Sequence, residues 1–289
     1  MKEIIFINGK FVAKDKAVVS AQSPGLQYGW GLFETMRSLN QRIVYFQEHL
    51  KRLKSSARRI GVALPYSVAA LRDIVNETVR RNGYKDSYIR LSVYKGERAS
   101  DIVVIVKKHA PYPWQRYRKG FRACISEFLQ NENSLLCQIK TTHRLTYELA
   151  YQRAVAQGYD EALILNQRGY LCEGTRTNLF MVSGNALFTP ALSSGCLEGI
   201  TRNAVVAVAV RNRMRVKEKN ITLKALLRSD EAFLTNSVRA VMPLVCVKRH
   251  RIAKEIVGPR TLFFIQEYQK LLHGGLNNST MHLLKKEIK

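Results

Sequence analysis

Apolar residues recur along the chain with two different periods, and these periods predict a mixture of short strands and amphipathic helices. Residues 3–13 contain two apolar runs, IIFI and FVA, on either side of Asn8-Gly9, the pair most typical of a two-residue hairpin turn. Between residues 46 and 60 apolar side chains recur every three or four positions, which predicts a helix. The same spacing predicts a second helix over residues 67–82.

The order of these elements predicts an α/β (or α+β) fold in two domains. Strands and helices alternate in two blocks, separated by APYPWQRYRKG, which has two prolines and no periodicity. We therefore expect a small N-terminal α/β domain (1–110), a linker (111–119), a larger C-terminal domain (120–275) and a polar basic tail (276–289).

Length and composition indicate a globular protein. The chain has 289 residues, 46% of them hydrophobic, which is enough for proper cores. No apolar run approaches the ~20 residues that span a bilayer, and the first residues lack the apolar core of a signal peptide. We expect a cytoplasmic protein. The five cysteines are scattered without zinc or redox spacing, so we expect reduced thiols and no metal site.

The formal net charge of +25 is unusual for a metabolic enzyme. Clustered Lys and Arg could neutralise the phosphates of a nucleic acid. Here the basic residues are spread over many short runs, and no nucleic-acid-binding motif accompanies them. We therefore expect no nucleic-acid partner, although a basic surface could attract a small anionic substrate.

Two residues between positions 137 and 180 could carry chemistry. Lys140 ends an apolar, strand-like run and precedes a helix-like run, and Glu173 precedes the apolar strand NLFMV. A lysine amine can attack an aldehyde cofactor, and a carboxylate can keep a pyridine nitrogen protonated. On composition alone, a solvated lysine and a turn glutamate would be the more common explanation.

Five sequence motifs favour a chemical role for Lys140 and Glu173 over the solvated one. IKTTHRL, GYDEALILN, EGTRTNLF, LEGITR and FLTNSVRAVMPL resemble, in the same order, the motifs of the fold-type IV pyridoxal-phosphate enzymes. That family includes branched-chain aminotransferases, D-amino-acid aminotransferases and 4-amino-4-deoxychorismate lyases. The resemblance implies a two-domain fold of that type, with pyridoxal 5'-phosphate bound by the C-terminal domain. It also implies a homodimer.

The resemblance assigns a role to each matching residue. Lys140 corresponds to the lysine that forms the Schiff base and then acts as a base, and Glu173 to the acid that faces the ring nitrogen. Leu197 would pack against the ring. The other cofactor residues would bind the phosphate: Arg52, Gly199, Ile200, Thr201, Ser237 and Val238.

Three of the phosphate residues also have a plainer explanation. Arg52 could be an ordinary charge on an exposed helix face, Thr201 a helix N-cap, and Ser237 the end of a strand. Tyr28, Thr35 and Arg90 occupy positions where the family lines its substrate pocket. Arg90 could clamp a carboxylate or form a salt bridge, and the sequence leaves both open.

Within the family, the third and fourth residues after the lysine separate the activities. Here they are His143 and Arg144, which would also contact substrate. The lyases show Asn-Arg at these positions, the D-amino-acid enzymes Asn and an apolar residue, and the branched-chain enzymes glycine-rich sequence. Arg144 therefore favours the lyase, whereas His143 departs from its pattern.

The resemblance thus predicts an aminodeoxychorismate lyase, which releases pyruvate and leaves 4-aminobenzoate for folate synthesis. Thr35 would deliver a proton to the departing group. The alternative is a class IV aminotransferase acting on branched-chain or D-amino acids with a 2-oxo acid acceptor. A more distant alternative is a basic nucleic-acid-binding or interaction protein on an enzyme scaffold. The presence of both Lys140 and Glu173 disfavours it.

Overall fold

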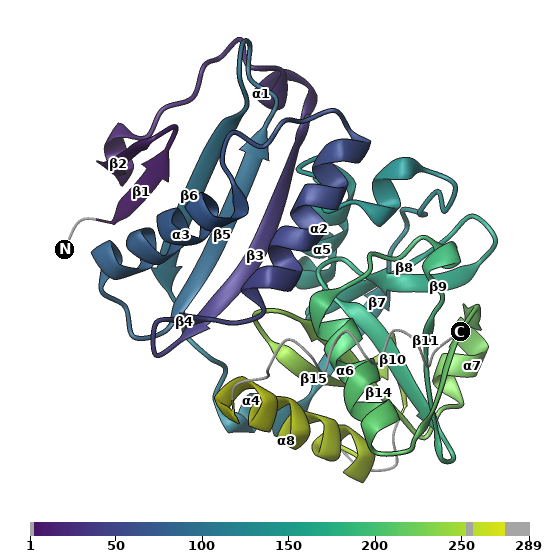
Figure 1. The fold of residues 1–289 in the computed structure, drawn as a ribbon. Helices are drawn as coiled ribbons and strands as arrows, with labels where there is room; N and C mark the ends of the chain where they lie inside the picture. The colour runs from purple at the N-terminus through teal and green to yellow at the C-terminus, as the bar shows by residue number, and fades with distance from the viewer. Residues whose placement is uncertain (1–2, 253–256, 275–289) are drawn as a thin grey trace. The chain divides into compact units, whose positions relative to one another are not determined.

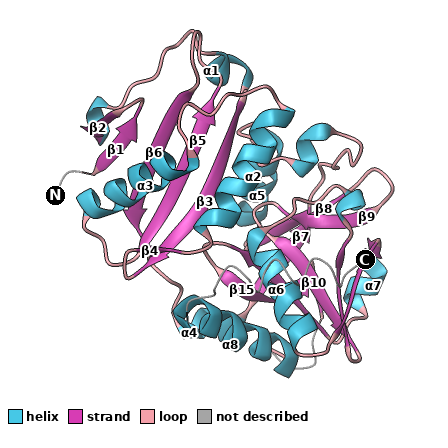
Figure 2. Cartoon of the chain, in the orientation of Figure 1, coloured by secondary structure: helices cyan, strands magenta, loops and turns pink. Residues whose placement is uncertain are grey.

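The computed structural model describes residues 3–252 and 257–274 (Figures 1 and 2). The chain divides into two compact units. The first unit is Met1–Pro111 together with Ile139–Arg144, and the second unit is Tyr112–Gln138 together with Leu145–Lys289. Each unit has its own sheet, which confirms the predicted α/β class. The predicted tail, residues 276–289, lies outside the described residues.

The first unit contains a six-stranded antiparallel sheet in the order β2-β1-β6-β5-β3-β4. Its strands are β1 (Ile4–Ile7), β2 (Lys10–Ala13), β3 (Gly31–Leu39), β4 (Arg42–Ile43), β5 (Ser87–Tyr94) and β6 (Asp101–Lys108). Its helices are α1 (Pro24–Tyr28), α2 (Phe46–Arg59) and α3 (Val68–Asn82).

Local sequence explains several of these boundaries. The β1–β2 turn has positive φ at both Asn8 and Gly9, as the Asn-Gly pair predicts. The N-terminus of α3 is capped by Ser67, whose side chain accepts a hydrogen bond from the Ala70 N–H at 3.1 Å. The same helix ends at Gly83, which is left-handed. The predicted hairpin and both predicted helices are therefore confirmed.

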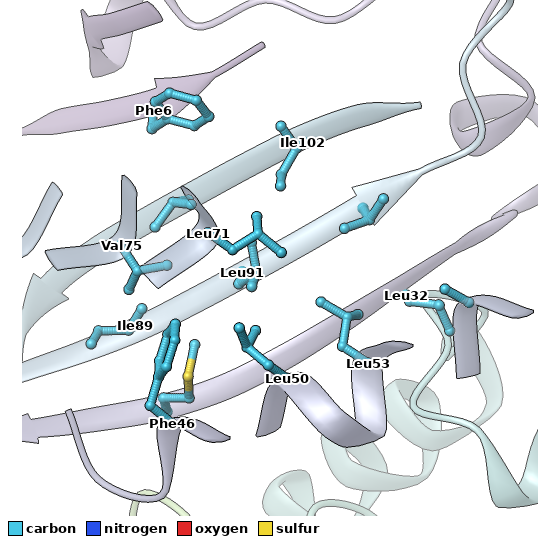
Figure 3. Packing of buried hydrophobic residues seen from close by; sticks show 14 of the residues in the cluster. Phe6, Leu32, Phe46, Leu50, Leu53, Leu71, Val75, Ile89, Leu91 and Ile102 are labelled. Carbon is cyan, nitrogen blue, oxygen red and sulfur yellow. The ribbon is translucent and has the colours of Figure 1, made fainter. Parts of the chain in front are cut away.

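Helices α2 and α3 cover one face of this sheet (Figures 1 and 3). Figure 3 shows Leu50 and Leu53 of α2 and Leu71 of α3 directed toward Ile89 and Leu91 of β5, and all five are at most 2% exposed. Because strand side chains alternate between faces, the neighbours of these core residues point to the opposite face of the sheet. That opposite face carries several of the candidate site residues.

The second unit contains a ten-stranded mixed sheet in the order β12-β11-β10-β14-β15-β7-β8-β9-β13, with β16 paired to β15. The strands on one side of its middle are β10 (Asn178–Ser183), β11 (Ala186–Pro190), β12 (Arg215–Lys219), β14 (Glu231–Asn236), β15 (Ala240–Val247) and β16 (His250–Arg251). The others are β7 (Phe121–Ile125), β8 (Glu161–Leu165), β9 (Tyr170–Gly174) and β13 (Ile221–Thr222).

The helices of the second unit are α4 (Trp114–Lys119), α5 (Leu145–Ala156), α6 (Ile200–Arg211), α7 (Leu223–Leu227) and α8 (Pro259–Gly274). Helices α6 and α8 lie against each other, and the buried Thr201 and Tyr268 hydroxyls are 3.4 Å apart (Figure 1). Within the described ranges, no helix is both long and apolar enough to cross a bilayer.

Two local predictions differ from the structure. The expected irregular linker at 111–119 contains helix α4, which begins directly after Pro113 and ends at Gly120. Proline is well suited to precede a helix, so its presence did not exclude one. Lys140 does not lie on a strand: the apolar run before it forms a 3-10 turn, Leu135–Gln138, which begins after the polar residues 131–134.

Candidate functional site

The segment that carries Lys140 is fixed to the start of β3. The Lys140 carbonyl accepts a hydrogen bond from the Phe33 N–H at 3.0 Å. The next two residues continue the pairing: Thr141 Oγ1 donates to the Gly31 carbonyl at 3.0 Å, and Thr142 Oγ1 donates to the Gly29 carbonyl at 2.8 Å. These bonds hold the backbone of Lys140 although it belongs to no regular element, which is why residues 139–144 group with the first unit.

Two cationic side chains lie beside the ring of Phe33. Lys140 Nζ is 4.5 Å from the ring centroid, and the guanidinium carbon of Arg90 is 3.8 Å from it. Arg90 on β5 is also the cross-strand partner of Thr35 on β3. The structure thus brings three predicted residues together: Lys140 and Arg90 meet at the Phe33 ring, and Arg90 and Thr35 are paired on the sheet face that α2 and α3 leave uncovered.

The opposite face of β3 carries a buried ionic cluster. Glu34 points inward between Leu32 and Met36 and receives two bonds from Arg52 on α2: Nε to Oε1 at 2.8 Å and an Nη to Oε2 at 2.6 Å. His49 Nδ1 is 2.7 Å from the same Oε2. The side chains of Glu34 and His49 are 1% exposed and that of Arg52 is 14% exposed. Arg52 is therefore not an ordinary charge on an exposed helix face.

The charges in this cluster follow from burial and pairing. Burial raises the pKa of Glu34, but the Arg52 guanidinium and the His49 bond outweigh it and lower that pKa to about 2. Burial lowers the pKa of His49, and Arg52 and Lys140 lower it further, against the opposing effect of Glu34. Glu34 is therefore ionised and His49 neutral near pH 7, with the His49 Nδ1–H donating to Glu34.

Glu173 lies in the second unit, near the end of β9, and is 7% exposed. Its Oε2 accepts hydrogen bonds from the Leu197 N–H at 3.0 Å and from Asn178 Nδ2 at 3.4 Å. Its Oε1 accepts a bond from the Tyr147 hydroxyl at 3.1 Å. Asn178 Nδ2 also donates to the Leu197 carbonyl at 2.8 Å, so this amide joins the carboxylate to the loop before α6.

That loop ends at the N-terminus of α6. Gly199 is the N-cap residue and no side chain caps the helix, so the alternative role of Thr201 as the N-cap is excluded. A methyl group on Gly199 would collide with the Asn178 side-chain oxygen, so a larger residue here requires this amide or the start of the helix to move. The first turn of a 12-residue helix presents N–H groups without intrahelical acceptors, and these favour an anion.

The turn between β14 and β15 carries Ser237 and Val238. Asn236, the last residue of β14, accepts hydrogen bonds on its side-chain oxygen from the Val238 N–H at 3.1 Å and the Arg239 N–H at 2.7 Å. Asn178 of β10 pairs with Thr235, the residue before Asn236. The second unit therefore places Glu173, the α6 N-terminus and this turn around the same end of β10.

Buried Glu161 supports the turn that follows Glu173. Its carboxylate accepts bonds from the Thr175 N–H at 3.0 Å, the Thr175 hydroxyl and the Thr177 hydroxyl at 3.1 Å. Glu161 is fully buried on β8. This network fixes the backbone between β9 and β10 and, with it, the position of Glu173.

The remaining predicted residues are more exposed. Tyr28, at the end of α1, is 70% exposed. His143 is exposed and its N–H donates to Thr141 Oγ1 at 3.2 Å, whereas Arg144 is half-buried. In residues 3–252 and 257–274, no group of three or more His, Cys, Asp or Glu side chains could hold a metal ion.

The sequence did not single out Phe33, Glu34, Tyr147 or Asn178. Glu34 had a detectable signal, because it alternates with Leu32 and Met36 on the core face of a strand, and a carboxylate there requires a partner. Phe33 had none beyond its apolar character. Tyr147 and Asn178 are recognisable only once the fold brings them to Glu173, 26 and 5 residues away in sequence.

Known proteins resemble this chain over most of its length. The family model described as "Amino-transferase class IV" matches residues 31–246. A protein of Methanocaldococcus jannaschii named "Putative branched-chain-amino-acid aminotransferase" is 33% identical over 267 residues, which cover 89% of this chain and 92% of that protein.

Solved structures show the same fold. The T.th. branched-chain amino acid aminotransferase with pyridoxamine 5'-phosphate superposes with a TM-score of 0.90 at 30% identity, covering 95% of each chain. A putative 4-amino-4-deoxychorismate lyase from Legionella pneumophila gives a TM-score of 0.83 at 23% identity, covering 89% of this chain and 96% of that one. The second likeness concerns the fold alone.

Proposed function

The chain belongs to the class IV aminotransferase family, and we propose that it is a pyridoxal-phosphate-dependent aminotransferase that moves an amino group from a branched-chain amino acid to a 2-oxo acid. The expected lyase activity is less well supported than this stated alternative. The relative that is 33% identical over most of both chains carries an aminotransferase name, whereas the lyase structure is similar in fold only.

The donors in the two units fit the chemical groups of this cofactor. We propose that Lys140 binds the aldehyde carbon, and that Glu173 accepts a hydrogen bond from the ring nitrogen. Arg52 and the N-terminus of α6, from Gly199 to Thr201, suit a phosphate because a guanidinium and helix N–H groups both bind oxyanions. Ser237 and Val238 are further phosphate candidates, and Leu197 would pack against the ring.

The cofactor supplies an aldehyde that accepts the amino group and a ring that accepts the electrons of a broken C–H bond. Lys140 Nζ would take the proton from the substrate α-carbon and would hold it for its return. Arg90 binds the substrate carboxylate, and Thr35, its cross-strand neighbour, limits the space beside it. Tyr28, His143 and Arg144 contact the substrate side chain.

One observation carries this proposal: Lys140 Nζ and the Arg90 guanidinium lie beside the same ring, that of Phe33, at 4.5 and 3.8 Å from its centroid. An amine for the amino-group chemistry and a guanidinium for the α-carboxylate are thus close together. Every amino acid carries both groups that these two side chains would serve.

The first test is whether Lys140 holds the cofactor. We expect purified wild-type protein to show visible absorption from bound cofactor, and borohydride to fix that cofactor on the peptide containing Lys140, as detected by mass spectrometry. Lys140→Ala should lose both signals, and Lys54→Ala, at an exposed position on α2, should keep them. Fixed cofactor on another lysine, or none in the wild type, would refute the proposal.

The second test separates the two activities. We expect leucine, isoleucine or valine alone to convert the bound cofactor to its amine form, and 2-oxoglutarate to restore it. Arg144 is the residue that favours the lyase, so a lyase remains the second candidate. It would ignore those donors and release pyruvate from aminodeoxychorismate without any 2-oxo acid acceptor.

A further inference from the structure

Two polar side chains outside the predicted site, Tyr147 and Gln130, form a hydrogen-bonded chain that ends at Glu173. Tyr147, in the first turn of α5, places its hydroxyl 3.1 Å from Glu173 Oε1 and 3.1 Å from the side-chain oxygen of Gln130. A phenol has one proton and cannot donate fully to two acceptors. If the Gln130 amide presents its NH₂ group instead, the Gln130 amide donates to Tyr147 and Tyr147 donates to Glu173.

The backbone holds Gln130 in place for this role. Its N–H donates to the Leu165 carbonyl at 2.8 Å, and its own carbonyl accepts from the Gln167 N–H at 3.2 Å. Gln130 also forms a bridge with Asn166 directly after β8. The first donor of the chain is therefore attached to the same sheet that carries Glu173, so the direction of the Tyr147 hydroxyl is set by a rigid element.

The contact also completes the fixation of the carboxylate. Oε2 of Glu173 is held by the Leu197 N–H, from the loop before α6, and by Asn178, the first residue of β10. Oε1 faces α5 and is held by Tyr147. A carboxylate bonded on both oxygens cannot rotate about its last torsion, and each hydrogen bond to the charged form favours ionisation.

We propose that Tyr147, oriented by Gln130, is a positioning residue that keeps Glu173 ionised and directed, so that the ring nitrogen of the cofactor stays protonated. This inference rests on the proposed function, because it needs Glu173 to face that nitrogen. Tyr147 does not touch the substrate in this proposal. It acts only through the carboxylate.

The test uses Tyr147→Phe in the full chain, loaded with pyridoxal 5'-phosphate that carries ¹⁵N at the ring nitrogen. The ¹⁵N chemical shift reports whether that nitrogen is protonated. We expect its titration midpoint to fall by about one pH unit in Tyr147→Phe, the size of one hydrogen bond to an ionised group. We also expect kcat to fall while KM for the amino donor stays close to its wild-type value.

The matched control is Tyr151→Phe, one turn further along α5. The ring of Tyr151 packs on the Arg176 guanidinium with 3.7 Å between guanidinium carbon and centroid, so removing its hydroxyl leaves this contact intact. We expect wild-type spectra from it. Gln130→Met should give a shift between wild type and Tyr147→Phe, because the Tyr147 hydroxyl would still donate to Glu173 but would lose the amide that orients it.

The outcomes are distinct. An unchanged ¹⁵N shift and midpoint in a folded Tyr147→Phe that binds the cofactor would overturn this inference and leave the proposed function standing. A lower melting temperature without any change at the nitrogen would show that Tyr147 is only structural, which also overturns it. A wild type that binds no cofactor would refute the proposed function itself.

Discussion

Two buried carboxylates in this molecule are held in opposite ways. Glu34 is matched by charge: a guanidinium binds both of its oxygens, and a histidine adds a third contact. Glu173 is held by neutral donors, a backbone N–H, an amide and a phenol. Pairing with a guanidinium cancels most of the field of a carboxylate, whereas neutral donors fix its direction and leave its charge in place.

The difference indicates that the two carboxylates have different roles in their units. In the first unit, Glu34 acts on another residue, because it fixes the guanidinium of Arg52 by two of its five N–H groups. In the second unit, the neutral donors suit a carboxylate whose charge is needed by a ligand. Substitutions in either cluster can therefore separate loss of stability from loss of cofactor binding.

The largest effect is expected for Glu34→Gln. It leaves the Arg52 guanidinium in a largely buried place without its counter-charge, and removing one partner of such a pair costs about 3–5 kcal/mol. Urea unfolding at pH 7 measures this loss. Glu77→Gln removes a carboxylate from an exposed Arg pair on α3 and should unfold close to the wild-type midpoint. Equal midpoints for both variants would contradict the structural role of Glu34.

The contribution of Glu34 to stability should also depend on pH in the acid range. The pKa of Glu34 is lowered to about 2 in the folded chain, below the value near 4.5 in an unfolded one. Its contribution to stability is therefore complete above pH 4.5 and is lost as the pH falls toward 2. Glu34→Gln should lack this part of the acid sensitivity, which urea midpoints at pH 5 and pH 3 measure.

Such clusters mark the limit of what the sequence can predict. The hairpin at Asn8-Gly9 and helices α2 and α3 follow from local periodicity and turn residues, and they are confirmed. The family motifs gave Lys140 and Glu173 as residues of interest. The bonds between β3 and α2 or between α5 and β9 join residues 15 to 26 positions apart, and no local pattern encodes them.

Lys140 shows the same limit at the level of the backbone. An apolar run before it, LLCQI, resembles a strand by composition, yet it forms a 3-10 turn whose Cys137 N–H bonds to the Ser134 carbonyl. Its neighbours Thr141 and Thr142 are held by hydroxyl bonds to Gly31 and Gly29, which lie 110 and 113 positions earlier in the chain. Tertiary contacts of that range override local preference.

Asn178→Ala tests the neutral cluster and ranks second. It removes the amide that donates to both Glu173 and the Leu197 carbonyl, and leaves that part-buried carbonyl without this donor. We expect a loss of about 1–3 kcal/mol in unfolding free energy. We also expect faster release of the cofactor, measured as the loss of its visible absorption from the protein fraction during gel filtration. A destabilised protein that retains its cofactor as well as the wild type would contradict the link from Asn178 to the site.

Gly199→Ala is expected to have a smaller and more selective effect. Its new methyl group collides with the side-chain oxygen of Asn178, so this amide or the first turn of α6 must shift from its present place. If that turn binds phosphate, affinity for pyridoxal 5'-phosphate should fall about tenfold, or about 1.4 kcal/mol, while affinity for pyridoxal, which lacks the phosphate, should fall less. Fluorescence titration with both compounds supplies the internal control. Equal losses for both would show that the helix end does not bind the phosphate.

The smallest effect is expected from His49, which tests whether the charge-matched cluster keeps its histidine neutral. Burial, first of all, lowers the pKa of His49 below 6.5 in the folded chain, so the unfolded chain binds the proton more strongly. The contribution of neutral His49 to the free energy of unfolding should thus be fully present above pH 6.5 and should decrease as the pH falls below that value. Burial lowers the pKa of His109 as well, so it adds to the same decline. Between pH 7.5 and pH 5.5, the free energy of unfolding should fall less in His49→Asn than in the wild type. It should fall least in the double variant that also carries His109→Asn. A slope in His49→Asn identical to that of the wild type would mean that the folded and unfolded chains bind the His49 proton equally, and a steeper loss in His49→Asn would mean that Glu34 holds a histidinium; either result would contradict a neutral His49.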